Sequence, residues 1–122
     1  MDLELSERLV DGCAIVELRG ELDISSADSL RERLLGILAG QSASLILDLA
    51  RLAFIDSTGI SVLVAAERRA HELGGTVSLA APQKIVARVL HITSLDRHFP
   101  VFPTVDDAIL ARCGSGPPVA AP

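Results

Sequence analysis

The chain has 122 residues, enough for one domain with a substantial core and too few for two. A composition of 49% apolar and 22% charged residues is typical of a globular protein rather than a disordered one. The net charge of −5 argues against binding to nucleic acid or anionic membranes, because both need a basic surface against phosphate.

The first elements in chain order form a predicted hairpin. Apolar and polar residues alternate over 3–6 and again over 14–18, which predicts two short strands, the second ending at Gly20. The intervening Asp11-Gly12 is a hairpin signal. We therefore expect the two strands to be antiparallel neighbours.

A helix and a buried strand follow. Ser25 or Ser26 is expected to cap a helix whose apolar residues recur at helical spacing as far as Gly40. The continuous apolar run Leu45–Leu49 suits an interior strand that is covered on both faces.

The second half of the chain repeats this alternation of helix and strand. The predicted elements are a helix with its buried face from Ile60 to Leu73, a strand over 76–80, a helix with Pro82 in its first turn, a short strand over 101–102, and a helix from Thr104 to Gly114.

Strands separated by helices indicate parallel pairs with crossover connections, so the chain is an α/β protein. By itself this order favours helices on both faces of the sheet. We expect one domain over 1–113. The tail 114–122 is rich in Gly and Pro and is expected to be disordered.

The stretch FIDSTGISVL, residues 54–63, places Asp56, Ser57, Thr58 and Gly59 between two apolar segments. The simplest interpretation is that Asp56 or Ser57 caps the helix. That interpretation leaves Gly59 unexplained, since glycine in a first helical turn costs about 1 kcal/mol against alanine. Its presence suggests that some group approaches the backbone closely.

A catalytic Ser57 is a second interpretation. The nucleophile motif G-x-S-x-G is broken, because Ile55 stands where its first glycine is needed. The candidate bases His71, His91 and His98 read as surface histidines, and no acid is seen to orient the last two. We therefore expect no enzyme activity.

A third interpretation makes Ser57 a phosphorylation site. If the strand ending at Gly20 lies beside the one ending near Ile55, Asp23 comes close to Asp56, and a phosphate at Ser57 adds negative charge beside existing acids. Along the following helix, Ser61, Val64, Ala65, Arg68 and Glu72 form either a partner surface or an ordinary solvated face.

Cys13 and Cys113 lie near opposite ends of the chain, without the spacing of a metal site. We expect two free thiols in a cytoplasmic protein, with no metal and no cofactor.

Two motifs resemble those of the anti-sigma factor antagonist family, the STAS domain: Gly20-Glu21-Leu22-Asp23 and Phe54-Ile55-Asp56-Ser57-Thr58-Gly59-Ile60. The similarity runs from the second strand to the last helix, and the two motifs together are fairly specific. It implies a STAS-type α/β domain with a mixed, mainly parallel sheet of about four to five strands. About four helices would pack on one face of that sheet.

The resemblance also implies a mechanism. In that family the serine after the aspartate is phosphorylated by an anti-sigma factor that is also an ATP-dependent serine kinase. The unphosphorylated antagonist binds the anti-sigma factor and releases the sigma factor, and a metal-dependent phosphatase reverses the modification. Carried over, Ser57 is the phosphoacceptor, Thr58 a less favoured one, Asp56 its acidic neighbour, and Asp23 lies close to the partner's nucleotide site.

The expected partner-binding residues are Asp23, Asp56, Ser57, Thr58, Gly59, Ser61, Val64 and Arg68. The protein is expected to be monomeric outside its heterocomplexes and to bind neither nucleic acid nor membrane. An alternative is an accessory or scaffold subunit, for example of a lipid-transport ATPase, in which Ser57 is only a cap. One departure from the family pattern is Ser94-Leu95-Asp96, where similar proteins often have Gly-Leu-Asp.

Overall fold

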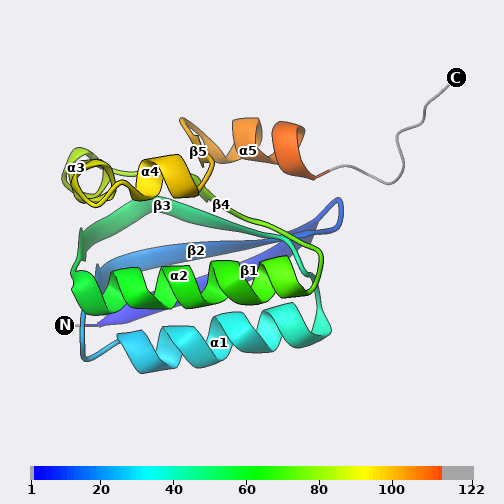
Figure 1. Cartoon of the computed structure of the whole chain (residues 1–122), viewed down its shortest axis with the longest axis horizontal. Coiled ribbons are helices and arrows are strands. Elements are labelled where there is room, and N and C mark those ends of the chain that lie inside the picture. The colour runs from blue at the N-terminus through cyan, green and yellow to red at the C-terminus, as the bar shows by residue number, and fades with distance from the viewer. Residues whose placement is uncertain (1, 114–122) are drawn as a thin grey trace, which may run out of the picture.

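A computed structural model describes residues 2–113 (Figure 1). These residues contain one five-stranded sheet, with the strand order β1-β2-β3-β4-β5, and helices packed against it. The strands are β1 (Leu3–Val10), β2 (Cys13–Leu22), β3 (Leu45–Ile55), β4 (Val77–Ala80) and β5 (Val101–Phe102). The helices are α1 (Ala27–Gly40), α2 (Ser57–Glu72), α3 (Lys84–Ile92), α4 (Leu95–His98) and α5 (Val105–Arg112). The α/β class and the mixed, mainly parallel sheet are confirmed.

The only antiparallel pair in this sheet is β1 with β2. Asp11 and Gly12 connect these strands with positive φ angles of 49° and 87°. Positive φ at both central residues characterises the type I′ turn, whose twist matches that of the flanking strands. The predicted hairpin is confirmed.

Strand β3 is longer than predicted, because the two apolar segments 45–49 and 52–55 belong to one strand. It pairs in parallel with β2 along nearly its whole length, with register shifts between Glu17 and Arg19 and between Gly20 and Glu21. The exposed residues Ala50 and Arg51 lie at this irregularity. They broke the apolar pattern in the sequence without ending the strand.

The main core lies between one face of the sheet and the helices α1 and α2, which run side by side in Figure 1. It includes Leu47 and Leu49 of β3 and Leu63, Ala66 and Ala70 of α2. The predicted buried face of α2 is wrong at its end, since Leu73 is the cap residue after the helix and is exposed.

The connection from β4 to β5 differs from the prediction in two ways. Helix α3 begins at Lys84, so Pro82 precedes the helix instead of lying in its first turn. The segment 95–98 is the short helix α4, an element that the apolar pattern did not predict. Ser94 leads into it with a left-handed conformation, φ 63°, which glycine adopts without steric cost.

The opposite face of the sheet is covered at one end by α5. There, a second apolar cluster joins Ala108 of α5 to Ile15, Ile46 and Ala80 of three strands. Helices therefore lie on both faces, as the element order alone predicted, and the single covered face implied by the resemblance is wrong in this respect. The predicted cap of α5 is confirmed, since Thr104 Oγ1 accepts a hydrogen bond from Asp107 N–H at 3.0 Å.

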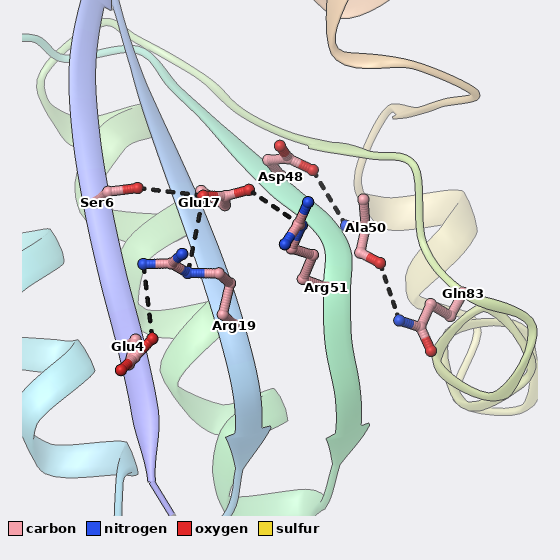
Figure 2. Close-up of polar contacts among 8 residues, drawn as sticks. All are labelled: Glu4, Ser6, Glu17, Arg19, Asp48, Ala50, Arg51 and Gln83. Atoms are coloured by element: carbon pink, nitrogen blue, oxygen red, sulfur yellow. Dashed lines mark hydrogen bonds and ion pairs between the residues drawn. The ribbon is translucent and has the colours of Figure 1, made fainter.

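The middle of that face carries polar side chains of β1, β2 and β3, as Figure 2 shows. Glu17 accepts a hydrogen bond from Ser6 and lies within 3.9 Å of charged nitrogens of Arg19 and Arg51. Arg19 also pairs with Glu4 at 3.6 Å. These solvent-accessible ion pairs contribute little to stability, but they keep this part of the sheet surface hydrated.

The prediction of two free thiols is wrong, because Cys13 and Cys113 form a disulfide. Their positions are 100 residues apart in the sequence, yet their Cα atoms are 5.6 Å apart. Cys13 is the first residue of β2 and Cys113 follows α5, so the packing of α5 on the sheet brings the two together. Spacing along the chain gave no sign of this.

The predicted disordered tail, 114–122, lies outside the described residues. Within 2–113, every helix is too short or too polar to cross a membrane.

Candidate functional site

The ends of β2 and β3 place the two sequence motifs side by side. The parallel register pairs Leu22 with Ile55, and the backbone N–H of Asp56 donates to the Leu22 carbonyl oxygen at 3.2 Å. Asp23 and Asp56 follow directly on these paired residues. The predicted juxtaposition of the two acidic segments is confirmed.

The N-terminus of α2 is capped by Asp56, whose Oδ1 accepts a hydrogen bond from Gly59 N–H at 3.0 Å. Ser57 is the first residue of the helix and is exposed. Its carbonyl oxygen accepts from Ser61 Oγ at 3.1 Å, while no group within 2–113 is hydrogen-bonded to its hydroxyl. The cap is therefore Asp56, and the Ser57 hydroxyl is free for other chemistry.

Gly59 is buried where α2 meets the end of β2. A Cβ atom at this position would lie 2.6 Å from Leu22 Cγ and 3.0 Å from the Leu22 carbonyl oxygen. The close approach that the sequence suggested is therefore made by the protein's own strand. Gly59 positions Ser57 without offering a surface to a partner.

Asp23 is held in a fixed loop before α1. Its Oδ1 accepts hydrogen bonds from Ser25 N–H at 3.0 Å and from Ser25 Oγ at 2.7 Å. Ser26 Oγ donates to the Glu21 carbonyl oxygen at 2.9 Å and accepts from Asp23 N–H at 3.0 Å. Ser26 is the N-cap residue of α1, but its side chain holds this loop instead of bonding the helix.

The hydrogen bond from the Ser25 hydroxyl lowers the pKa of Asp23 below its usual 3.8, against a smaller opposing effect of burial. Asp23 is ionised near neutral pH, as an ordinary aspartate is, and the lowered pKa extends this charge to more acidic pH. The edge of the sheet next to Ser57 thus presents a fixed negative charge.

One stripe of α2 continues from Ser57 along the helix. Ser61, Val64 and Arg68 follow at intervals of four, three and four residues, which places them on one side of the helix. Ser61 and Arg68 are exposed and Val64 is half-buried. Beyond Arg68 the surface is hollowed between α2 and α4, where the lining residues include Val64, Arg68 and His98.

Two exposed apolar side chains at the same edge were not predicted as site residues. Ile24, next to Asp23, is 77% exposed, and Phe54, paired in register with Glu21, is 44% exposed. Strand alternation was a usable signal for Phe54, because a buried Ile55 turns its neighbour to the opposite face. Ile24 stands alone among polar residues, a pattern that also indicates exposure.

The histidines are exposed, as predicted, but two of them do have acidic partners. His91 Nδ1 lies 2.9 Å from Asp96, and His98 Nε2 lies 3.1 Å from Glu67. Glu67 is ten residues beyond Ser57 on α2, about 15 Å along the helix at its usual rise. This pair is therefore too distant to activate Ser57. In the described part of the chain, no three His, Cys, Asp or Glu residues are grouped to hold a metal ion.

Comparison with known families shows which family has this fold and these two motifs. The model of the STAS domain matches residues 5–108, a span that contains both motifs and runs from within β1 into α5. The chain belongs to the STAS domain family.

Two relatives of this chain carry related names. The anti-sigma-F factor antagonist RsfB of Mycobacterium tuberculosis is 29% identical over 101 residues, which cover 81% of this chain and 80% of RsfB. The anti-sigma-B factor antagonist of Bacillus subtilis is 36% identical over 80 residues, covering 66% of this chain and 72% of the relative.

A solved STAS structure agrees in fold. The crystal structure of an anti-sigma factor antagonist from Mycobacterium paratuberculosis superposes with a TM-score of 0.83 at 29% identity. The alignment covers 91% of this chain and 94% of that one. The family and fold expected from the two motifs are thereby confirmed.

Proposed function

We propose that this protein is an anti-sigma factor antagonist whose partner is an anti-sigma factor with ATP-dependent serine kinase activity. In the unphosphorylated state it binds that partner and releases the sigma factor. Phosphorylation of Ser57 ends the binding, and a metal-dependent serine phosphatase restores it. The protein acts in the cytoplasm by binding and not by catalysis.

The main support for this proposal is that Asp56 and Ser57 have different roles at the start of α2. Asp56 supplies the helix cap, so the exposed Ser57 hydroxyl has no structural task among the described residues. A serine that served only as a cap would have its oxygen bonded to a backbone N–H of the first turn. The names of the relatives support the same function.

The charges around Ser57 explain how a phosphate would act as a switch. Phosphorylation transfers the γ-phosphoryl group of ATP to Ser57 Oγ, with loss of the hydroxyl proton and release of ADP. The product adds a charge of about −2 next to Asp56 and Asp23. The N-terminus of α2 tolerates this charge within the free protein. A partner that docks over the acids meets the added repulsion and desolvation cost.

The proposed binding surface combines this edge with the stripe on α2. Ile24 and Phe54 would provide apolar anchors, as such side chains do at the centres of interfaces. Ser61, Val64 and Arg68 would extend the contact along the helix, and Thr58 and the two acids would surround Ser57. The buried Gly59 is left out of the surface.

The test is a binding experiment with three baits: wild type, Ser57→Ala and Ser57→Asp. We expect wild type and Ser57→Ala to capture the same ATP-binding serine kinase from the native cell extract, identified by mass spectrometry. A penalty of about 3 kcal/mol would weaken Ser57→Asp binding on the order of 100-fold. Circular dichroism should show that all three baits are folded.

The purified kinase, given ATP, should then place one phosphoryl group on wild type and none on Ser57→Ala. Thr58→Ala removes the other candidate acceptor and should still receive one phosphoryl group, at Ser57. Equal capture of a transporter ATPase by all three baits would instead support the scaffold alternative.

A further inference from the structure

The disulfide joins β2 to the end of α5, two parts of the fold that otherwise meet through a small apolar cluster. Cys13 begins β2 directly after the hairpin turn, where it pairs with Val10 of β1, and Cys113 follows the last described helix. Both residues belong to the second apolar cluster, on the face of the sheet opposite α1 and α2.

Apart from the disulfide, helix α5 is held on the sheet by a small apolar contact, in which Val105 and Ile109 are half-buried against the second apolar cluster. The helix has eight residues, and only Ala108 among them is buried, while Leu110 is 83% exposed. Isolated helices shorter than about 12 residues are marginal in water. The link between the C-terminal end of α5 and β2 therefore adds to a small apolar contact in holding this helix on the sheet.

The main core does not depend on α5. No residue of α5 is part of the large cluster that joins α1, α2 and the sheet within the described residues. Local opening of a thinly packed terminal element costs less free energy than global unfolding. Detachment of α5 would therefore expose both cysteines, which are buried when the helix is docked, with 1% of Cys13 and 9% of Cys113 exposed.

We propose that Cys13 and Cys113 are a reversible redox site that fastens α5 to the sheet when oxidised and releases it when reduced. The cytoplasmic setting of this proposal rests on the proposed function, because disulfides inside mesophilic cells are usually transient. The reactants are low-molecular-weight thiols and their disulfides.

The exchange proceeds through a mixed disulfide. One cysteine thiolate attacks a small disulfide RSSR and expels one RS⁻. The second cysteine thiolate then attacks the protein sulfur of the mixed disulfide and expels the second RS⁻. One S–S bond breaks and one forms, two electrons pass from the cysteines to RSSR, and the two cysteine protons end on two RSH.

This site is separate from the Ser57 surface. Cys13 lies at the start of β2 and Asp23 follows its end, so the two are about 30 Å apart along a strand of ten residues. Reduction would expose Ile15 and Ile46 beneath α5. It would leave the C-terminal ends of β2 and β3, next to Ser57, unchanged.

The experiment uses the full-length protein in buffers of reduced and oxidised glutathione at a series of ratios. Free thiols are trapped with a maleimide after acid quenching and counted by intact mass. We expect one transition, from two trapped thiols to none, within the glutathione range. Hydrogen exchange should show amides 105–113 exchanging on the order of 10-fold faster in the reduced protein, with α1 and α2 unchanged.

The melting temperature should also fall on reduction, by on the order of 10 °C, because the linked loop is long. The double variant Cys13→Ser with Cys113→Ser is the control. It should resemble the reduced protein in α5 exchange and show no response to glutathione.

Two thiols trapped at every glutathione ratio would overturn the proposal, as would a disulfide that persists in fully reduced glutathione. Unchanged exchange of α5 on reduction would overturn the fastening role. None of these measurements involves a partner protein, so the result is independent of the capture experiment with the Ser57 variants.

Discussion

The backbone N–H of Asp56 donates a hydrogen bond to the carbonyl oxygen of Leu22, 3.2 Å away, and so joins the loop after β3 to the end of β2. This contact holds two motifs, more than thirty residues apart in the chain, next to each other at one edge of the sheet. Asp23 and Ser57 lie on either side of it. The candidate site is therefore built on paired strand ends, with the exposed Ser57 hydroxyl on the first residue of α2.

The first prediction concerns the assignment of the helix cap. Asp56→Ala removes the acceptor for Gly59 N–H and should lower the free energy of unfolding by about 1 kcal/mol. Asp56→Asn keeps an acceptor and should cost less. Ser57→Ala should change stability by less than about 0.5 kcal/mol. Urea unfolding of the three variants checks this, and a larger loss for Ser57→Ala than for Asp56→Ala would contradict the assignment.

The second prediction concerns the contact between Gly59 and β2. Gly59→Ala places a methyl group against Leu22 and should destabilise the protein by about 1–3 kcal/mol in spite of the better helix propensity of alanine. Gly36→Ala is the matched control, because a Cβ at this position in α1 meets nothing within 4 Å. It should stabilise the protein by about 0.5–1 kcal/mol. Thermal or urea unfolding gives both values, and two changes of the same sign would refute this packing argument.

The third prediction concerns the pH dependence of stability. The folded-state pKa of Asp23 is lowered by Ser25, so the ionised carboxylate favours the folded protein. This contribution is fully present well above pH 3.8 and is lost as the pH falls below that value through the folded-state pKa. The stability advantage of wild type over Asp23→Asn should therefore shrink as the pH is lowered from 5 toward 2.

Ser25→Ala serves as the control for this pH dependence, since it removes the side-chain donor and should reduce the slope in the same acidic range. Urea unfolding at a series of pH values measures the difference. An advantage that stays constant down to the lowest pH would show that Asp23 titrates normally.

The fourth prediction concerns the turn between α3 and α4. Ser94 has φ 63°, in the left-handed region where a Cβ atom is unfavourable. Ser94→Gly should raise the free energy of unfolding by about 0.5–1 kcal/mol. Ser94→Ala keeps the Cβ atom and should give no such gain. A gain in urea unfolding from both substitutions would point to the serine hydroxyl, and not the backbone conformation, as the source of the cost.

The sequence by itself determined the features that depend on neighbouring residues. Asp11-Gly12 specified its turn because few other pairs accept positive φ twice, and Thr104 specified the cap of α5 through one side-chain oxygen. The order of strands and helices, and hence the α/β class, followed from apolar periodicity. The two motifs indicated the family because each lies within a short continuous segment.

Only the tertiary structure decided how distant segments meet. It assigned the cap to Asp56, because the bond to Leu22 fixes the backbone of that residue, and it made Gly59 a packing position. It also paired Cys13 with Cys113, since the path of α5 over the sheet depends on packing across 100 residues of chain. Local propensity carries no information on such contacts, because their free energy arises only when the whole sheet has formed.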